Sequence, residues 1–518
     1  MKRNLLILLT VLCALGLTLN SYAAPEGTIR IASPTGASGS GFTYESTDPI
    51  FWETFWGWAM YDPLLTLDPQ GNPVGVVAES YGISPDGNTW TFKIRKGIKF
   101  HNGDPLTSAD VKFSVDRFAS QESTNPWSPY LRKNYASTST PDDYTFIYKT
   151  VKPEPQLTMP FTYVRILPKN YFEKIGQDAF RKAPIGSGPY KFVKLVHSTS
   201  FEMEANTNYW RQVPAFKTVI DLLVPEEATR VAMLRSGEID IATDLTIDRI
   251  VEFQKLGYTL QEVGLNTLFN ISFPGTWATD SPTSDIRVRQ AMSYAVNRQE
   301  MCDTYFKGMA KPGSRWYINE NGWAWDPSWK PDPYDVAKAK QLLANAGYPG
   351  KFKDPVIQVY TQAGPQADLM QMLQGYWSAV GIQTKITVVD SVTYANLFFK
   401  GNRDPGAKNM GAVIPWLYPT YANGVYHSAN MYTSKGVHST GNDPKADELY
   451  NKAVSEPDPV KAKQYYTDFQ NYAYNMWVNV GILQRPTYAP VGSKLGAFTN
   501  YHALGIYYIL PGIQQKKK

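Results

Sequence analysis

Cysteine is almost absent from the chain, which has only Cys13 and Cys302 among its 518 residues. Cys13 lies within an apolar N-terminal run, so a chain that loses this run keeps Cys302 alone and can form no intrachain disulfide. Stability in an oxidising compartment must then come from the burial of apolar side chains. The scarcity also excludes zinc sites built from cysteine pairs.

A large charge excess of either sign is also lacking. The sequence carries 51 Lys and Arg residues against 46 Asp and Glu residues, a formal charge of +5. Loss of Lys2 and Arg3 with the N-terminal run lowers this charge to +3. So small a surplus on so long a chain argues against nucleic acid or an anionic membrane as a partner.

Long hydrophobic runs are missing after the first 24 residues. Lys2 and Arg3 precede a mostly apolar stretch at 5–19, and Ser-Tyr-Ala follows at 21–23. This order is typical of a secretory signal that is cleaved after residue 23, whereas a membrane anchor needs roughly 20 apolar residues. Cys13 lies inside the run rather than directly after the cut, so no lipid anchor is expected. The mature protein is predicted to be secreted and soluble.

Catalytic motifs are absent as well. The sequence has no HExxH, GxSxG, Walker or helix-opening GxGxxG motif, and "GASGSG" at 36–41 lacks the required spacing. The histidines are scattered, which fits structural or surface roles: His101, His197, His427, His438 and His502. We therefore expect neither an enzyme nor a cofactor. A glycan-acting hydrolase stays an alternative, because a pair of catalytic carboxylates leaves no sequence motif.

Short strand patterns alternate with helical patterns along the remaining chain. "WTFKIRKGIKF" (90–100) alternates as a strand does. "DPYDVAKAKQLLANAGYPG" (332–350) predicts a helix capped by Asp332, and residues 368–389 predict a helix, a turn at Gly381 and a strand. This alternation predicts α/β layers.

The stretch "FWETFWGWAMYDP" (51–63) holds six aromatic residues within eleven positions. Its rings form two neighbouring helical stripes, Trp52-Phe55-Trp56 and Phe51-Phe55-Trp58. One buried face cannot take so many rings. Either the core surrounds this segment on several sides, or some rings face a cavity that a ligand fills.

Further motifs follow one another through the chain. They are "AESYGISPDGNTWTFKIRKGIKFHNGDPLTSADVKFSVDR" (78–117), "APIGSGPYKFV" (183–193), "NTNYW" (206–210), "EEATRVAMLRSGEIDIA" (226–242), "VRQAMSYAVNRQEM" (288–301) and "VGIQTKITVVD" (380–390). Together they resemble the extracytoplasmic solute-binding proteins of ABC importers, specifically the large peptide- and nickel-binding family five. Within them we interpret Gly186, Gly188 and Pro189 as backbone geometry. We interpret the hairpin residues as a polar rim: Arg95, Lys96, His101 and Asp104.

The resemblance implies a periplasmic binding protein-like α/β fold of two lobes, joined by a two-crossing hinge, with an extra inserted domain. It places a signal peptide at 1–23, lobe I at 24–54, 185–270 and 485–518, the inserted domain at 55–184, and lobe II at 271–484. A small-molecule or peptide ligand between the lobes favours the closed state through the contacts it makes there. The implied protein is a monomer in the periplasm, and its implied partners are ABC permease subunits in the inner membrane.

In peptide-binding members of this family, an aspartate in a Trp-x-x-Asp-Tyr motif pairs with the α-amine of the peptide. The matching stretch here, "IPWLYPTYANGVYH" (414–427), has no aspartate, and no carboxylate lies between Asn409 and Asp443. A buried ammonium without a counter-charge is costly. Peptide is the family default, but this departure favours an oligosaccharide or another ligand without a free amine.

The resemblance also implies two walls for the ligand cleft. Lobe I contributes Phe51, Trp52, Glu53 and Trp56. Lobe II contributes Trp416, Tyr418, Tyr421 and His427. Flat rings suit the faces of sugars or aromatic rings, and Glu53 is a candidate replacement for the missing aspartate. For each ring the alternative is packing within a lobe core.

Arg315, with Trp316 and Tyr317 beside it, forms a third candidate group. Its planar guanidinium suits a ligand carboxylate, and an ordinary surface arginine is the alternative. Two other functions stay open. Binding of nickel or a metal chelate needs several ligands, of which His427 is one candidate. A secreted chaperone or peptide-sensing receptor on the same fold is the other.

The wall assignment predicts that Trp52→Ala and Trp416→Ala each weaken binding of the natural ligand. Loss of one stacked ring is expected to raise the Kd about tenfold, which corresponds to about 1.4 kcal/mol. Isothermal titration calorimetry with each purified variant measures the change. If both variants keep the wild-type affinity, the rings belong to the lobe cores instead.

Overall fold

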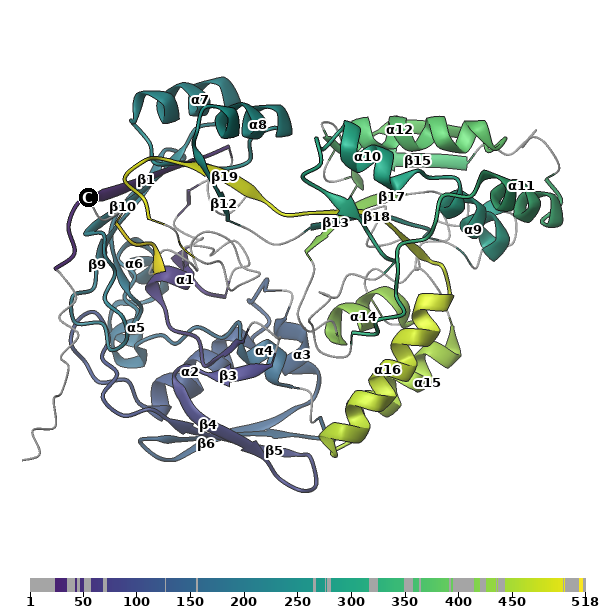
Figure 1. Ribbon diagram of the computed structural model, residues 1–518. Coiled ribbons are helices and arrows are strands. Elements are labelled where there is room, and N and C mark those ends of the chain that lie inside the picture. The colour runs from purple at the N-terminus through teal and green to yellow at the C-terminus, as the bar shows by residue number, and fades with distance from the viewer. Residues whose placement is uncertain are drawn as a thin grey trace, which may run out of the picture.

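The structure is a computed structural model that describes most of the chain after residue 23. The described residues are 24–34, 42–43, 47–50, 57–68, 72–125, 127–154, 157–263, 267–274, 276, 281–315, 325–348, 357–362, 365–390, 393–394, 414–419, 425–434, 436, 443–496, 498 and 512–515. They form two lobes, and the second lies at the far end of a pair of hinge strands (Figure 1). Within these ranges every helix is too short or too polar to span a bilayer.

The first lobe is built on a seven-stranded mixed sheet. In spatial order its strands are β12 (Thr259–Glu262), β19 (Tyr488–Val491), β11 (Ile241–Ala242), β1 (Thr28–Ser33), β10 (Thr218–Leu223), β9 (Ser200–Ala205) and β8 (Tyr190–Val196). Strand β1 runs parallel to β10 and β11, and the other neighbours are antiparallel. Helices α7 (Glu227–Ser236) and α8 (Ile247–Lys255) pack on the sheet and bury a separate apolar cluster.

The inserted part of the chain forms a four-stranded antiparallel sheet. Its order is β4 (Ala78–Ile83), β5 (Thr89–Ile94), β7 (Thr145–Thr150) and β6 (Tyr135–Asp142). A small hairpin, β2 (Leu65–Leu67) and β3 (Pro73–Gly75), and the helices α2 (Ser108–Phe118), α3 (Ser128–Lys133) and α4 (Thr158–Phe161) bury residues in its core. Helices α5 (Lys169–Ile175) and α6 (Gln177–Lys182) instead bury Phe172 and Phe180 in the core of the first lobe's sheet. Strand β5 confirms the alternation predicted at 90–100 only as far as Ile94, where the strand ends; up to there Trp90, Phe92 and Ile94 are buried while Lys93 is exposed.

The second lobe contains a four-stranded antiparallel sheet and a parallel pair. The sheet order is β14 (Lys311–Pro312), β18 (Asn479–Arg485), β13 (Thr267–Ser272) and β17 (Ile414–Pro419). The parallel pair is β15 (Ile357–Thr361) and β16 (Thr384–Val388), which α12 (Pro365–Ala379) connects. The remaining helical elements are η2 (Pro282–Ser284), α9 (Ile286–Tyr294), α10 (Arg298–Thr304), α11 (Val336–Asn345), α14 (Val425–Tyr432), α15 (Pro444–Ser455) and α16 (Pro459–Asn475).

Two sequence predictions in this lobe have clear outcomes. The helix, Gly381 turn and strand expected at 368–389 are confirmed by α12, a φ of 93° at Gly381, and β16. The cap predicted for α11 was wrong, because Asp335 rather than Asp332 accepts a hydrogen bond from the Lys338 amide at 2.8 Å. Asp332 is instead buried, where it accepts a hydrogen bond from Ser293 at 2.7 Å.

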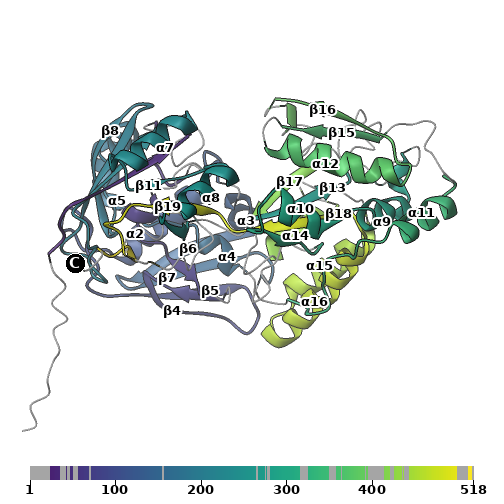
Figure 2. The same ribbon diagram turned by 45° about the horizontal axis from the view of Figure 1, so that its top comes forward.

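Two connections join the two large sheets within the described part of the chain, and the strands at their ends are neighbours, since β12 pairs with β19 and β13 pairs with β18. One leads from β12 to β13, and the other leads from β18 to β19 (Figures 1 and 2). This arrangement fits a two-crossing hinge. The domain boundaries that the resemblance implies stay a prediction.

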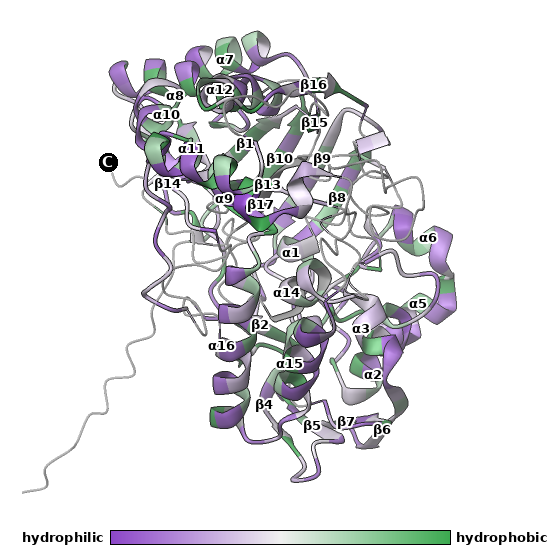
Figure 3. Cartoon of the chain, turned by 90° about the vertical axis from the view of Figure 1, so that its right-hand side faces the viewer, coloured by the Kyte–Doolittle hydropathy of each residue, from purple (hydrophilic) through white to green (hydrophobic). Residues whose placement is uncertain are grey.

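The lobes also meet away from the hinge, where the inserted sheet faces α15 and α16. Apolar residues of β5 and β7 and of these two helices belong to one buried cluster. A Cβ on Gly87 would lie 3.9 Å from Cβ of Pro457. Both helices carry hydrophobic and hydrophilic residues along their length (Figure 3). We call this packing of the inserted domain against α15 and α16 the interlobe contact.

Candidate ligand-binding site

The predicted lobe I wall at 51–56 lies outside the described residues, but both ends of this segment are fixed. On the N-terminal side the Ile50 carbonyl accepts hydrogen bonds from Ser123 Oγ at 3.0 Å and from the Thr124 and Asn125 amides at 3.2 Å. The buried Asp48 carboxylate pairs with both terminal nitrogens of Arg117, at 3.0 and 3.1 Å. Such a two-pronged ion pair fixes direction as well as position.

On the C-terminal side, α1 (Gly57–Met60) and the two residues after it are buried. The Tyr61 hydroxyl donates to the Thr47 carbonyl at 3.0 Å and so ties the two ends together. Asp62 accepts hydrogen bonds from Trp210 Nε1 and the Tyr209 hydroxyl at 2.8 Å each. The aromatic segment is therefore bracketed by two anchored turns.

Burial raises the pKa of Asp62, while Trp210, Tyr209 and Ser187 oppose this rise by donating to its carboxylate. Ser187 Oγ lies 3.0 Å from Oδ2 of Asp62. The donors come from the "GSGPY" and "NTNYW" stretches, which supplied the family resemblance. Sequence reasoning missed Asp62, although an acidic residue directly after an aromatic run is an unusual feature.

The glycines of 186–188 let two backbones touch. A Cβ on Gly186 would lie 2.0 Å from the Met60 carbonyl oxygen, and one on Gly188 would lie 2.5 Å from the Met60 carbonyl carbon. The Gly188 amide donates to the Met60 carbonyl at 2.9 Å. Their interpretation as backbone geometry fits this contact, which holds α1 in place.

His101 of the inserted domain forms hydrogen bonds to the turn at 186–188. The Gly186 amide donates to its Nδ1 at 3.2 Å, so Nδ1 carries no proton, and Nε2 donates to the Gly188 carbonyl at 3.0 Å. Burial lowers the pKa of His101 to about 4, against the opposing effect of the Gly188 carbonyl. The interpretation of His101 as part of a polar rim was therefore wrong, because its ring is mostly enclosed between two chain segments.

The predicted lobe II wall is described only in part. Trp416 and Tyr418 lie on edge strand β17, opposite Asn270 and Leu268 of β13. His427 lies in α14. Behind these elements Asn270, Ser272 and Asn479 are buried, and Asn479 donates to the Tyr432 hydroxyl at 3.2 Å. The wall assignment stays a prediction, and the following residues lie outside the described ranges: Phe51, Trp52, Glu53, Trp56, Trp316, Tyr317 and Tyr421.

Arg315 is held by its own chain. Its guanidinium stacks on Tyr474 and Trp477, with centroid distances of 3.8 and 3.5 Å, and Nη1 donates to the Tyr474 carbonyl at 2.8 Å. Asp332 supplies a counter-charge at 3.2 Å. The alternative of an ordinary surface arginine was wrong, because its side chain is 10 % exposed. Contact with a ligand carboxylate stays a prediction and competes with Asp332.

Arg165 is a second buried arginine near the aromatic segment, and sequence reasoning missed it. It is 5 % exposed, and its guanidinium lies 4.2 Å from the ring centroid of Trp58 in α1. Burial lowers its pKa to about 10, and only Tyr61 and Tyr163 oppose this effect. Among the residues that the structure describes, neither its Nε nor its Nη1 has a hydrogen-bond partner. A single charge within the apolar stretch "MPFTYVRIL" (159–167) was the available sequence signal.

Two other buried arginines of this chain have guanidinium groups with several hydrogen-bond partners. Arg289 and Arg298 also have pKa values lowered to about 10 by burial. Arg289 donates to four backbone carbonyls at 2.7 to 2.9 Å, and Arg298 donates to backbone carbonyls and to the Ser293 hydroxyl. Arg165 shares their burial but lacks their partners.

Comparison with known proteins identifies the class. Residues 72–433 match the family described as bacterial extracellular solute-binding proteins, family 5 middle. The chain therefore belongs to the bacterial extracellular solute-binding proteins of family 5, which confirms the resemblance. It is the solute-binding component of an ABC importer and works outside the cytoplasm with permease subunits.

Relatives and solved structures agree with this assignment. A Brucella ovis protein with a provisional assignment as an ABC transporter peptide-binding protein is 28 % identical over 479 residues, which cover 86 % of this chain and 85 % of that protein. The glutathione-binding protein GsiB of Salmonella choleraesuis is 29 % identical over 412 residues, covering 77 % of each chain. The structure of NikA from Brucella suis in complex with Fe(III)-EDTA has a TM-score of 0.81 at 20 % identity, covering 95 % of this chain and all of that one. The last likeness confirms the periplasmic binding protein-like fold.

Gly188→Ala is predicted to destabilise the protein strongly, because its Cβ would overlap the Met60 backbone, which cannot move freely. We expect a loss of at least about 3 kcal/mol in the free energy of unfolding. Gly82→Ala is the matched control, since no atom lies within 4 Å of its added Cβ. Its expected cost is below about 1 kcal/mol. Urea unfolding measures both, and equal costs would contradict the close contact.

The His101 turn predicts a loss of stability in acid. The pKa of His101 is about 4 in the folded chain and about 6.5 when unfolded, so its neutral form stabilises the fold fully above pH 6.5. This contribution, at most about 3 kcal/mol, is lost as the pH falls from 6.5 to 4. Urea unfolding between these pH values should show a weaker pH dependence in His101→Gln than in wild type. The exposed His197→Gln control should keep the wild-type dependence, and an equal slope in all three proteins would contradict the assignment.

Proposed function

We propose that this importer component captures a small organic solute that carries an anionic group, and that Arg165 binds this group. The single observation that supports the proposal is a buried guanidinium with partnerless Nε and Nη1 beside the anchored aromatic segment. A buried charge without a partner costs several kcal/mol, so a bound carboxylate or similar anion offsets a large penalty.

The sequence also favours an anionic ligand, because it lacks acidic residues where relatives bind an amine. No carboxylate lies between Asn409 and Asp443, where peptide-binding relatives place the residue that holds an amine. A cation available in the inserted domain and no acid in this stretch of lobe II favour an anionic ligand over one held by its ammonium. Peptides with a free carboxylate, acidic sugar derivatives and carboxylate chelates of a metal all fit this description.

Closure of the lobes completes the proposed mechanism. A solute that contacts both lobes favours the closed state only by the contacts it gains there. The aromatic rings predicted at 51–56 and at 416–421 supply such contacts, and Arg165 fixes the orientation of the solute. Delivery takes place in the periplasm after signal cleavage at residue 23, by a monomer that catalyses no reaction.

A nickel or metal-chelate binding protein is the second candidate function. The likeness to NikA in complex with Fe(III)-EDTA favours it, since that ligand is a carboxylate chelate. Arg165 suits the carboxylates of such a chelate without contacting the metal. Metal analysis of the purified protein separates this candidate from a metal-free solute.

Native mass spectrometry of the purified protein tests the ligand chemistry. We expect a co-purified solute with at least one carboxylate or other anionic group. In Arg165→Gln its affinity should fall by a factor of about 30 or more, which corresponds to at least 2 kcal/mol for a truncated buried charge pair. Arg211→Gln, which removes the same charge from an exposed site of lobe I, should keep the solute. A neutral solute, or equal loss in both variants, would contradict the role of Arg165.

A further inference from the structure

A cavity of about 520 Å³ lies between the lobes beside the hinge. We call it the hinge pocket. Lobe I lines it with the start of α8 and with Tyr488 of β19, and lobe II lines it with the end of α10, the start of α12 and Arg485 of β18. Because its walls belong to both lobes, its volume depends on the angle between them.

The hinge pocket lies on the other side of the hinge strands from the candidate site. In Figure 1, α8 and α10 stand on one side of the two crossings, whereas α1 and α14 stand on the other side. A rotation that brings the candidate walls together must move α8 and α10 apart. The hinge pocket therefore widens as the lobes close.

Contacts differ greatly between the two sides in this structure. On the candidate-site side the interlobe contact is closely packed. Burial is the largest cause of the raised pKa of Tyr450 in α15, and the nearby Tyr130 and Glu154 of the inserted domain raise this pKa further. Across the hinge pocket, Lys307 and Asp248 form an ion pair at 3.9 Å with side chains 49 % and 80 % exposed. So exposed and long a pair contributes little.

We propose that the hinge pocket is a conformational lever, in which added volume favours the closed, solute-holding state. A group that fills the pocket is accommodated when the lobes are closed and must be expelled or compressed when they open. If the added group is more stable in the closed state than in the open state, this difference in free energy shifts the ratio of closed to open molecules by the same amount. The lever acts on the solute site from the opposite side of the hinge and touches no solute.

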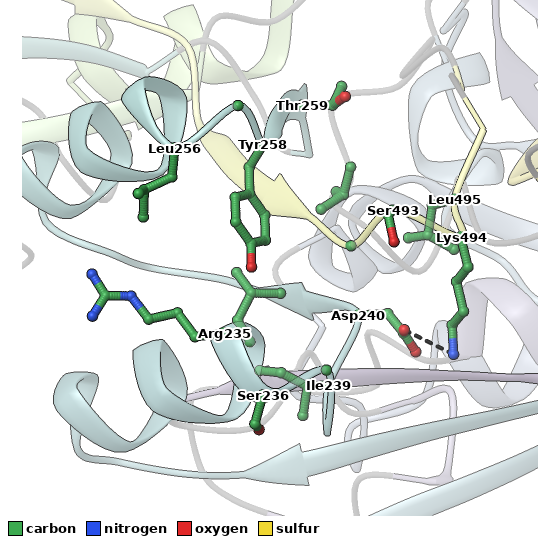
Figure 4. Close-up of a pocket in the computed structure, with 15 residues that line it drawn as sticks. Arg235, Ser236, Ile239, Asp240, Leu256, Tyr258, Thr259, Ser493, Lys494 and Leu495 are labelled. Atoms are coloured by element: carbon green, nitrogen blue, oxygen red, sulfur yellow. Dashed lines mark ion pairs between the residues drawn. The ribbon is translucent and has the colours of Figure 1, made fainter.

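A second cavity in lobe I supplies the matched control. It also has a volume of about 520 Å³, but its lining comes only from residues 234–240, 256–259 and 491–495 (Figure 4). Lys494 and Asp240 form an ion pair within it at 2.8 Å. Since a single lobe lines this cavity, filling it should not affect closure.

The test places one tryptophan in each cavity. Thr304 is the last residue of α10 and lines the hinge pocket, and Ser236 is the last residue of α7 and lines the control cavity. Both are exposed, and each hydroxyl donates to a carbonyl of its own helix. Thr304→Trp and Ser236→Trp therefore each replace a small hydroxyl residue with tryptophan at the exposed end of a helix beside a cavity.

Pulsed electron spin resonance measures closure in the full chain without added solute. Spin labels on Lys152→Cys and Lys461→Cys, both exposed, report the distance across the interlobe contact, and Cys302 is fully buried. We expect Thr304→Trp to raise the ratio of closed to open molecules about three-fold or more, and Ser236→Trp to leave it unchanged. This readout does not depend on the ligand chemistry, so the lever and the role of Arg165 can fail separately.

A variant on the opposite wall guards against local misfolding. Ile247→Trp, in the first turn of α8, fills the same pocket from lobe I and should shift the ratio in the same direction. Circular dichroism shows whether each variant folds, and Phe replaces Trp at a position where Trp unfolds the protein. An unchanged or lowered closed population in the folded hinge-pocket variants would overturn the proposal.

Discussion

The contact between the backbone of residues 186–188 and the Met60 carbonyl is the constraint on which the candidate site depends. Without side chains at Gly186 and Gly188, the two segments approach closely enough for the Gly188 amide to bond to Met60 at 2.9 Å. His101 closes the turn with a neutral ring, and the Asp62 carboxylate collects donors from the same region. The described residues on both sides of 51–56 are thus held by the packing of lobe I and the inserted domain together, and a precise site needs such rigid support.

The motifs that define the family act on structure rather than on the ligand. The "GSGPY" and "NTNYW" stretches lie 125 to 148 residues away from Asp62, yet Ser187, Tyr209 and Trp210 all donate to its carboxylate. In the proposed function the anionic group of the ligand is bound by Arg165, which lies outside these motifs. This separation explains why one framework occurs both in a relative named for glutathione and in a structure with Fe(III)-EDTA.

The sequence correctly predicted those structural features that depend only on neighbouring residues. The strand alternation at 90–94 and the left-handed turn at Gly381 are confirmed, because each depends on a few neighbouring residues. The cap of α11 and the role of His101 were wrong, because Asp332 and His101 are used by partners far along the chain. Asp62 was missed for the same reason, and Arg165 was missed because it is buried beside Trp58, a residue far along the chain. A polar residue in an apolar stretch signals a buried partner, but the sequence does not identify the partner.

The buried arginines of this chain differ in how their guanidinium groups are hydrogen-bonded. Arg289 and Arg298 satisfy their guanidinium groups with backbone carbonyls, so their burial joins elements of lobe II. Arg165 is about as buried, but within the described part of the chain its Nε and Nη1 have no hydrogen-bond partners, which makes the solute-free state less stable than a fully hydrogen-bonded guanidinium would. In the proposed function this penalty favours the loaded state over the empty one, since a bound anionic solute supplies the missing partners. The two proposals therefore concern one equilibrium between open and closed lobes, which the charge at Arg165 and the volume of the hinge pocket are both proposed to shift.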